Sequence, residues 1–369
     1  MKNKVRVKLR EIIRPLARIA KKMLFDAKVG QKVVGQLGVL AVTGNWPDRP
    51  PHGTLRGVDF YPANALVRAI ACGAQNFKNR HGYLPNLVFP DTFSEHIFVR
   101  KFFAPLPVPS LANKLAAYEY VKARLGDEIL PSVVWVGDNL SELLKTELPT
   151  GRLVLKPNHG ANFILFINAT DDLVVRHMEI EKTSTQWLET RYGYEWGEWQ
   201  YCTFKPKLFL ERFIDFDQGD TPHDFKLYCF NGYVCLIEIG INRFTQLKTA
   251  FYDRSWKHIP VSYSGRKPLQ YQRPENLDEM IAIAETITKS MQFARIDLYS
   301  DCKRNIKFGE ITFTPGNALS RYTRRSWLGS YREDFAFDKW LGAFFRQTPP
   351  IPLTRKTLIH GLGWDQRQF

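Results

Sequence analysis

The 369-residue chain has few cysteines and no long apolar run, and each shortage excludes a class of protein. Its five cysteines are odd in number and form no C-x-x-C pair, which excludes a disulfide framework or zinc knuckle and favours reduced thiols in cytoplasm. No apolar run approaches the roughly 20 residues that a membrane-spanning helix needs. The basic N-terminus has no apolar core before a small-residue cleavage site, so we expect no secretory signal.

Positive charge is concentrated at the N-terminus. Residues 1–32 contain eleven lysines and arginines against two acidic residues, a net charge of +9 out of +15 for the whole chain. Apolar residues recur there at near-helical spacing with basic residues between them, and Pro15 interrupts any single helix. An interfacial helix on an anionic membrane is one interpretation, and a solvated helix packed on its own domain is the other. We expect no nucleic-acid partner, because no recognisable reader module follows.

The rest of the chain predicts helices and strands in a mixed α+β or α/β arrangement. We expect helices over residues 63–74, 111–125, 276–291 and 334–346. We expect strands over residues 133–136, 152–156, 163–167 and 208–214, and two hairpins, 224–230 with 233–239 and 293–299 with 306–313. The Asn231-Gly232 pair is the strongest short hairpin signal among them.

The second hairpin carries two carboxylates. A turn centred on Lys303-Arg304 predicts three cross-strand pairs, namely Arg295 with Thr312, Asp297 with Glu310, and Tyr299 with Phe308. Since side chains alternate along a strand, Arg295, Asp297, Glu310 and Thr312 share one face, and the other face is apolar.

Two carboxylates that face each other repel unless a cation lies near them. Mg²⁺ held by one or two carboxylates and by nucleotide phosphates suits Asp297 and Glu310. The alternative is an exposed acidic pair that Arg295 or Lys307 neutralises. After the hairpin, Pro315-Gly316 forms a turn whose backbone N–H groups can hold an anion.

These motifs resemble a known superfamily. Arg295-Ile-Asp297 followed by Glu310-Ile-Thr312-x-x-Pro315-Gly316 resembles the metal hairpin of ATP-grasp enzymes such as the D-alanine–D-alanine ligases, which have R-x-D and then E-x-N-T-x-P-G. The chain is more similar to the teichuronopeptide-biosynthesis (TupA-like) ATP-grasp family. The matching segments run in family order from about residue 85 to about residue 345, and they are Thr92–Glu95, Asn113-Lys114, Val154–Gly160, Asp224–Gly232, Pro274–Leu277 and Gly309–Phe313.

The resemblance implies an ATP-grasp fold, with the nucleotide held between two α+β lobes behind an N-terminal α/β lobe. The implied division is a basic amphipathic segment 1–32, an α/β lobe and start of the ATP-grasp region 33–150, a small lobe with the phosphate loop 151–215, a large lobe with the metal hairpin 216–346, and a tail 347–369.

The resemblance also implies a role for individual residues. Those that would bind ATP are Lys114, Lys156, His159, Gly160, Glu211, Arg212, Ile214 and Asp224, and those that would hold one or two Mg²⁺ ions are Asp297, Glu310 and Thr312. Catalysis would rest on Lys226 and Arg295, and substrate binding on Arg295, Gly316 and Asn317. The phosphate loop 157–162 has a single glycine, and Thr312 stands where many relatives have Asn, so both departures weaken the match there.

The implied activity is ATP-dependent ligation of a carboxylate to an amine through an acyl phosphate, with ADP as product. The family points to a uronic acid in surface polysaccharide or capsule biosynthesis as the acid, and to an amino acid or other amine as its partner. The implied location is the cytoplasmic face of the cell membrane, reached through residues 1–32. The alternatives are ligation of two amino acids, a transferase or kinase that acts on a glycan, and an inactive membrane-associated binding module. The aromatic residues between 192 and 204 either stack on sugar rings or belong to the core.

Overall fold

A six-stranded antiparallel sheet forms the larger half of the molecule. The computed structural model describes residues 32–33, 36, 52–107, 110–143, 145–168, 176–216, 222–241, 247–263, 270–325 and 331–346. The predicted segment 1–32, apart from Lys32, and the predicted tail 347–369 lie outside these residues. The strand order is β10-β9-β8-β7-β12-β13. Their bounds are β7 His223–Phe230, β8 Tyr233–Ile241, β9 Lys248–Asp253, β10 His258–Ile259, β12 Phe293–Ser300 and β13 Ile306–Thr312.

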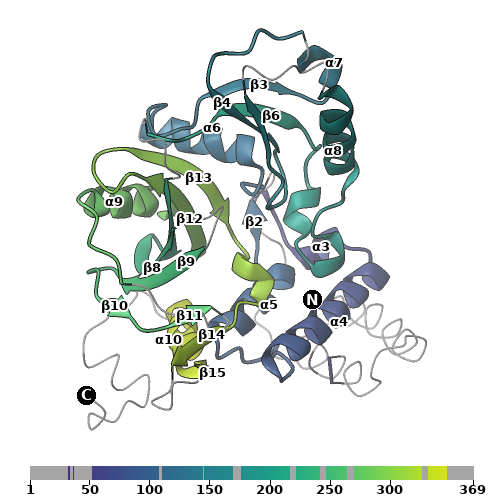
Figure 1. Ribbon diagram of the computed structural model, residues 1–369. Coiled ribbons are helices and arrows are strands. Elements are labelled where there is room, and N and C mark those ends of the chain that lie inside the picture. Colours follow the sequence, from purple (N-terminus) through teal and green to yellow (C-terminus); the bar gives the residue numbers. More distant parts are fainter. Residues whose placement is uncertain are drawn as a thin grey trace.

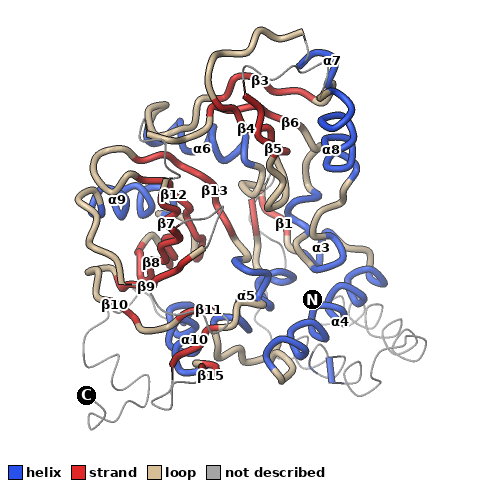
Figure 2. The backbone as a smooth tube through the Cα atoms, in the orientation of Figure 1, coloured by secondary structure: helices blue, strands red, loops and turns tan. Residues whose placement is uncertain are grey.

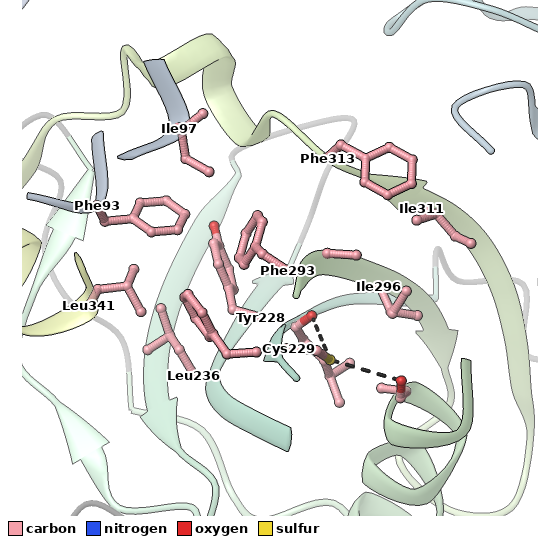
Figure 3. Close-up of a cluster of buried hydrophobic side chains, with 14 of the residues drawn as sticks. Phe93, Ile97, Tyr228, Cys229, Leu236, Phe293, Ile296, Ile311, Phe313 and Leu341 are labelled. Atoms are coloured by element: carbon pink, nitrogen blue, oxygen red, sulfur yellow. Dashed lines mark hydrogen bonds between the residues drawn. The ribbon is translucent and has the colours of Figure 1, made fainter. Parts of the chain in front are cut away.

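Apolar side chains cover the back of this large sheet. Helix α9 (Leu277–Thr288) packs against β7, β8 and β12 with its buried apolar side. On the opposite face from α9, Phe93 and Ile97 of α5 (Phe93–Phe103) lie over Tyr228 and Phe293 at one end of the strands, as Figure 3 shows. The core therefore fixes which face of β12 and β13 remains for polar side chains.

A second, four-stranded sheet of order β3-β6-β4-β5 forms the upper lobe in Figure 1. Its strands are β3 Val133–Gly137, β4 Arg152–Pro157, β5 Leu165–Asn168 and β6 Leu208–Arg212, with helices α7 Leu140–Leu143 and α8 His177–Glu189 beside them. Because β3 pairs with β6, this small sheet begins at Val133, ahead of the boundary predicted at residue 151. The sequence predicts this short strand but carries no signal for its partner. Only the pairing with β6 shows that the strand belongs to the small sheet.

Helix α6 (Lys114–Leu125) connects the two sheets. Its Tyr118 ring makes edge-to-face contacts with Phe209 of the small sheet and Phe308 of the large one, at centroid distances of 6.1 and 6.0 Å. The helix begins one residue after Asn113, whose side chain accepts the N–H groups of residues 115 and 116. This cap places Lys114 at the first position of α6, and Figure 1 shows that helix lying between the two sheets.

A layer of helices lies below both sheets. It contains α3 Gly57–Phe60, α4 Ala63–His81, α5 and α10 Phe335–Ala343, with the short 3₁₀ turns η1 Tyr194–Trp196, η2 Trp199–Cys202, η3 Pro315–Ala318 and η4 Phe344–Arg346. Small strand groups complete the fold, β1 Thr54–Leu55 with β2 Leu106–Pro107, and β11 Ser262–Tyr263 with β14 Tyr322–Arg325 and β15 Tyr331–Glu333. Residues 52–107 thus hold helices and both strands of the small β1–β2 sheet rather than a full α/β lobe. Among the described helices, none combines the length and apolar character needed to cross a membrane.

Both predicted hairpins form. In the first, Phe230 pairs with Tyr233, and Asn231 and Gly232 adopt positive φ values of 50° and 74°. In the second, the predicted pairs of Arg295 with Thr312 and Asp297 with Glu310 are confirmed.

The third predicted pair of the second hairpin is wrong. Tyr299 lies opposite Lys307 and not Phe308, because the register shifts by one residue after Asp297. The extra residue in β13 is Gly309, where a Cβ would lie 3.0 Å from the carbonyl oxygen of Asp297. A bulge at this glycine absorbs the shift and keeps the two carboxylates opposite each other.

Candidate active site

The polar face of the large sheet carries a row of four charged side chains. The register places Glu238 of β8 next to Lys226 of β7, Lys226 next to Asp297 of β12, and Asp297 next to Glu310 of β13. Side chains that stand directly opposite on neighbouring strands are within reach of one another. The four side chains thus form one line across the sheet, in which the cation Lys226 stands between Glu238 and Asp297 and the carboxylate of Glu310 follows.

Arg295 holds the carboxylate of Asp297 through two hydrogen bonds. Its Nε and Nη2 donate to Oδ1 and Oδ2, each at 2.6 Å, and Nη2 also donates to the Thr312 hydroxyl at 3.2 Å. Thr312 in turn donates to Glu310 Oε1 at 3.2 Å, and the Arg295 Nη2 atom lies 3.7 Å from the same oxygen. Burial raises the pKa of Asp297, although Arg295 and Lys226 lower it.

The same residues can be tested as a metal site. In the described ranges no group of three or more His, Cys, Asp or Glu side chains is arranged to hold a metal ion. Asp297 and Glu310 nevertheless supply two carboxylates on one face, and Mg²⁺ takes its remaining ligands from phosphates and water. Lys307 does not neutralise this pair, because its Nζ donates to the carbonyls of Glu128 and Leu130 at 2.6 and 3.2 Å. An oxygen-only donor set of this kind fits Mg²⁺ bound together with a nucleotide.

Lys226 stands at the centre of the charged row. It forms an ion pair with Asp224 on its own strand. Burial lowers the pKa of Lys226, but the carboxylates of Asp224, Glu238 and Asp297 raise it further, so the net shift is upward. Lys226 therefore stays positively charged at neutral pH.

Glu238 is a member of this row that the sequence analysis missed. It is 4% exposed and accepts hydrogen bonds from Tyr228 at 3.0 Å and from Tyr263 at 2.8 Å. The available signal was a lone Glu inside the apolar run of β8, which is costly to bury without a partner.

Three of the predicted ATP-binding residues lie at or just after the end of β6, an inner strand of the small sheet. Glu211, 1% exposed, forms an ion pair with Lys156 and accepts a hydrogen bond from Tyr118 at 2.9 Å. Arg212 donates its side chain to the carbonyl of Thr150 at 3.0 Å, and the half-buried Ile214 follows the end of β6. The buried Glu211 thus has the partner that its place in an apolar strand requires.

The predicted phosphate loop is held to α6 by Lys114. The Lys114 Nζ atom donates to the carbonyl of Gly160 at 2.6 Å, and its N–H donates to the carbonyl of Asn158 at 2.9 Å. Burial lowers the pKa of Lys114. Gly160 has a φ of 73°, and a Cβ there would lie 2.9 Å from the Phe163 ring, so the single glycine of the loop has a steric reason.

His159 is buried in this loop. Burial, with Lys114 nearby, lowers its pKa from 6.5 to about 4, so the imidazole is neutral at pH 7. The predicted contact of His159 with a nucleotide stays a prediction, and it would be one between neutral imidazole and phosphate.

The loop that follows β13 is held in place by hydrogen bonds from helices α4 and α5. Gly316, Asn317 and Ala318 have φ values of 58°, 53° and 65°, three successive left-handed residues. Lys101 of α5 donates to Asn317 Oδ1 at 2.6 Å, and the Arg80 Nε atom donates to the Leu319 carbonyl at 3.0 Å. Figure 2 shows β13 reaching this layer near α5. The predicted substrate residues therefore lie on a loop that helices hold in place.

The aromatic segment 192–204 divides between core and surface. Trp199 is fully buried, stacks on Phe60 at 5.4 Å and donates its indole N–H to the Lys101 carbonyl at 2.6 Å. Trp196 is 50% exposed. Stacking on a sugar is thus excluded for Trp199 in this conformation and stays open for Trp196.

Comparisons with known proteins place this site in a family. The sequence model of the TupA-like ATP-grasp family matches residues 97–346, more than half of the chain. No curated protein matches the chain.

Solved structures with a related fold include several ligases. One is D-alanine–D-alanine ligase from Bacillus anthracis complexed with ATP, at 16% identity and a TM-score of 0.33, covering 56% of this chain and 56% of that chain. Another is D-alanine–D-alanine ligase from Helicobacter pylori, at 13% identity and a TM-score of 0.35, covering 61% and 62%. A third is ATP-grasp ligase PsnB complexed with a precursor variant, Mg and ADP, at 12% identity and a TM-score of 0.32, covering 55% and 50%. The chain thus spans less than two thirds of each of these proteins.

Proposed function

Because this chain belongs to the TupA-like ATP-grasp family, we propose that it is a ligase that joins a carboxylate to an amine through an acyl phosphate. The observation that carries the proposal is the charged row on the large sheet, where Lys226 and Arg295 adjoin the facing carboxylates of Asp297 and Glu310. Lys114, at the start of α6, interacts electrostatically with Glu310, and Lys156 forms its ion pair with Glu211 of the small sheet. Cations beside two facing carboxylates are what a triphosphate and its Mg²⁺ require.

The chemistry starts from an unreactive substrate. A carboxylate resists attack by an amine because oxide is a poor leaving group, whereas phosphate leaves readily. Lys226, held positive by three carboxylates, is placed to neutralise charge on the phosphoryl group as it moves to the acid. Mg²⁺ bound at Asp297 and Glu310, as one ion or two, would supply further neutralisation of the phosphates.

Arg295 has a second task in this scheme. Its guanidinium donates hydrogen bonds to Asp297 and Thr312. Burial lowers the pKa of Arg295, but Asp297, Tyr228 and Glu310 raise it further, so the buried guanidinium keeps its charge. A fixed cation at this point would stabilise the oxyanion that forms when the amine attacks the acyl carbon. Gly316 and Asn317 would then hold the acid or the amine on the loop behind it.

We propose a uronic acid, free or in a glycan intermediate, as the acid and an amino acid or similar amine as its partner, in surface polysaccharide or capsule biosynthesis. This substrate class rests on the family alone. The test is to incubate the protein with ATP, Mg²⁺, pooled uronic acids and pooled amino acids, and to follow nucleotides, phosphate and new masses together. We expect ADP and phosphate in equal amounts with one condensed product. AMP and pyrophosphate would indicate adenylation, and a phosphorylated sugar without an amide would indicate a kinase.

We also propose that residues 1–32 attach the protein to the cytoplasmic face of the membrane. The support is the net charge of +9 in that segment. Liposomes of anionic lipid should pellet the full-length protein at low salt, and high salt should release it, because exposed charges are screened within about 8 Å at physiological ionic strength. Protein lacking residues 1–32 and neutral liposomes serve as controls. Equal pelleting of both forms would remove this claim.

A further inference from the structure

A buried carboxylate outside the predicted site lies beside the end of β13. Glu198, between η1 and η2, is 7% exposed. Its Oε1 atom accepts a hydrogen bond of 2.6 Å from the hydroxyl of Thr314, which stands four residues after Glu310 and two before Gly316. Glu198 therefore adjoins the point where the metal hairpin passes into the predicted substrate loop.

The hydrogen bonds around Thr314 have a fixed direction. Since the Thr314 hydroxyl donates its only proton to Glu198, the Gln200 side chain must donate its NH₂ to that hydroxyl, at 3.0 Å. The amide oxygen of Gln200 then points elsewhere. It is buried and has no hydrogen-bond partner among the residues that the structure describes. A buried acceptor without a donor is costly, and a ligand that donates hydrogen bonds would satisfy it.

The buried cation Lys101, which interacts electrostatically with Glu198, is bound to other acceptors. Lys101 is 1% exposed and donates to the carbonyl of Trp196 at 2.9 Å and to the Asn317 side chain at 2.6 Å. Within the described part of the chain, Glu198 forms no direct ion pair with it. Lys101 influences Glu198 through space, as do Glu310 and the tyrosines Tyr61, Tyr192 and Tyr201.

Glu198 is held rigidly where it lies. Gly193 and Gly197 both have positive φ, and a Cβ at Gly193 would lie 2.6 Å from the Glu198 Cβ. Lys101 binds the segment at the Trp196 carbonyl, and Trp199 binds back to the Lys101 carbonyl at 2.6 Å. Such a segment loses little entropy when it binds a ligand.

We propose that Glu198 binds the ammonium group of the amine substrate and accepts one of its protons when the amine attacks the acyl phosphate. The proposal rests on the ligase function given above. A buried carboxylate and a buried, unpartnered amide oxygen, on two side chains that bond to the same Thr314 hydroxyl, form a receptor for an ammonium ion, which has only donors to offer.

The reaction step balances with this assignment. The nitrogen lone pair forms the C–N bond to the acyl carbon, and the bond from that carbon to the phosphate oxygen breaks with its electron pair. Of the two protons that the ammonium group loses, one goes to Glu198 and the other leaves with phosphate. Burial raises the pKa of Glu198, which suits a group that takes up a proton during catalysis.

Hydroxylamine separates this role from the earlier phosphorylation of the acid. It is largely unprotonated at neutral pH, so it traps an acyl phosphate as a hydroxamate without a base. The test uses ATP, Mg²⁺ and pooled uronic acids, with either hydroxylamine or pooled amino acids as the nucleophile. We expect Glu198→Gln to lower amide formation at least about 50-fold, while hydroxamate formation stays within about threefold of wild type.

Two further variants define the result. Glu195→Gln, at an exposed position in the same segment, should leave both rates unchanged, and Glu198→Asp should recover part of the amide rate. Equal loss of both products in Glu198→Gln, or loss of neither, would overturn the proposal while the proposed function stands. Absence of both products with wild-type protein would instead overturn the proposed function, and the role of Glu198 with it.

Discussion

Asp297→Asn and Glu310→Gln should each lower the turnover of ATP to ADP by on the order of 10²-fold or more. The two carboxylates face each other on the metal hairpin, and each substitution replaces a charged oxygen with a weak neutral ligand. Steady-state release of phosphate measures the loss. Raising Mg²⁺ should restore part of the activity of Glu310→Gln, because a weaker site fills at higher ion concentration.

The two variants differ in their expected effect on folding. Asp297 is paired with Arg295 in the interior, so Asp297→Asn leaves a buried guanidinium without its counter-ion and should lower stability. The Glu310 side chain is 33% exposed and lies 3.7 Å from Arg295, so it is not the main counter-ion of that buried guanidinium. Glu310→Gln should therefore fold normally. Glu279→Gln, at an exposed position of α9, is the matched control. Near-normal turnover in Glu310→Gln with an intact fold would rule out the hairpin as the metal site.

Lys156→Met and Glu211→Leu should each lower the free energy of unfolding by about 3 kcal/mol or more, and the double variant by little more than either alone. Each single change leaves one buried charge unpaired, whereas the double change removes both. The side chains are 16% and 2% exposed, so water compensates little for the loss. Urea unfolding of the four proteins gives the coupling energy.

The exposed ion pair of Lys205 with Asp138 provides the comparison. Its removal should change stability little, because both side chains are solvated and screened. Additive losses for Lys156 and Glu211 would mean that the two side chains do not depend on each other. The same variants should also weaken ATP binding, since both residues are predicted to contact the nucleotide.

The ATP-grasp fold that the motifs predicted is confirmed by the family match. Local chemistry made the hairpins accessible from sequence, because Asn231-Gly232 sets one turn and strict alternation sets the face of Asp297 and Glu310. The bulge at Gly309 was not accessible in this way. A single extra residue changes no apolar period, so only the pairing of β12 with β13 reveals it.

Long-range contacts limited the prediction of the site. Lys101 meets Asn317 across 216 positions of sequence, and Glu198 meets Thr314 across 116. No local pattern around Lys101 distinguishes it from the exposed lysine of an ordinary helix. Glu211 and Glu238 were accessible in principle, since both interrupt apolar strands, and the family motif drew attention only to the first.

The central claim is that the acid is activated as an acyl phosphate. The most direct measurement repeats the pooled assay with uronic acids whose two carboxyl oxygens carry ¹⁸O, followed by mass analysis of the released phosphate. If an acyl phosphate forms, we expect one ¹⁸O atom in each phosphate, one ¹⁸O atom retained in the amide, and ADP as the nucleotide product. Phosphate without label would mean that ATP is hydrolysed by water and that no acyl phosphate forms, and ¹⁸O in AMP would place the attack at the α-phosphate; either result contradicts the account.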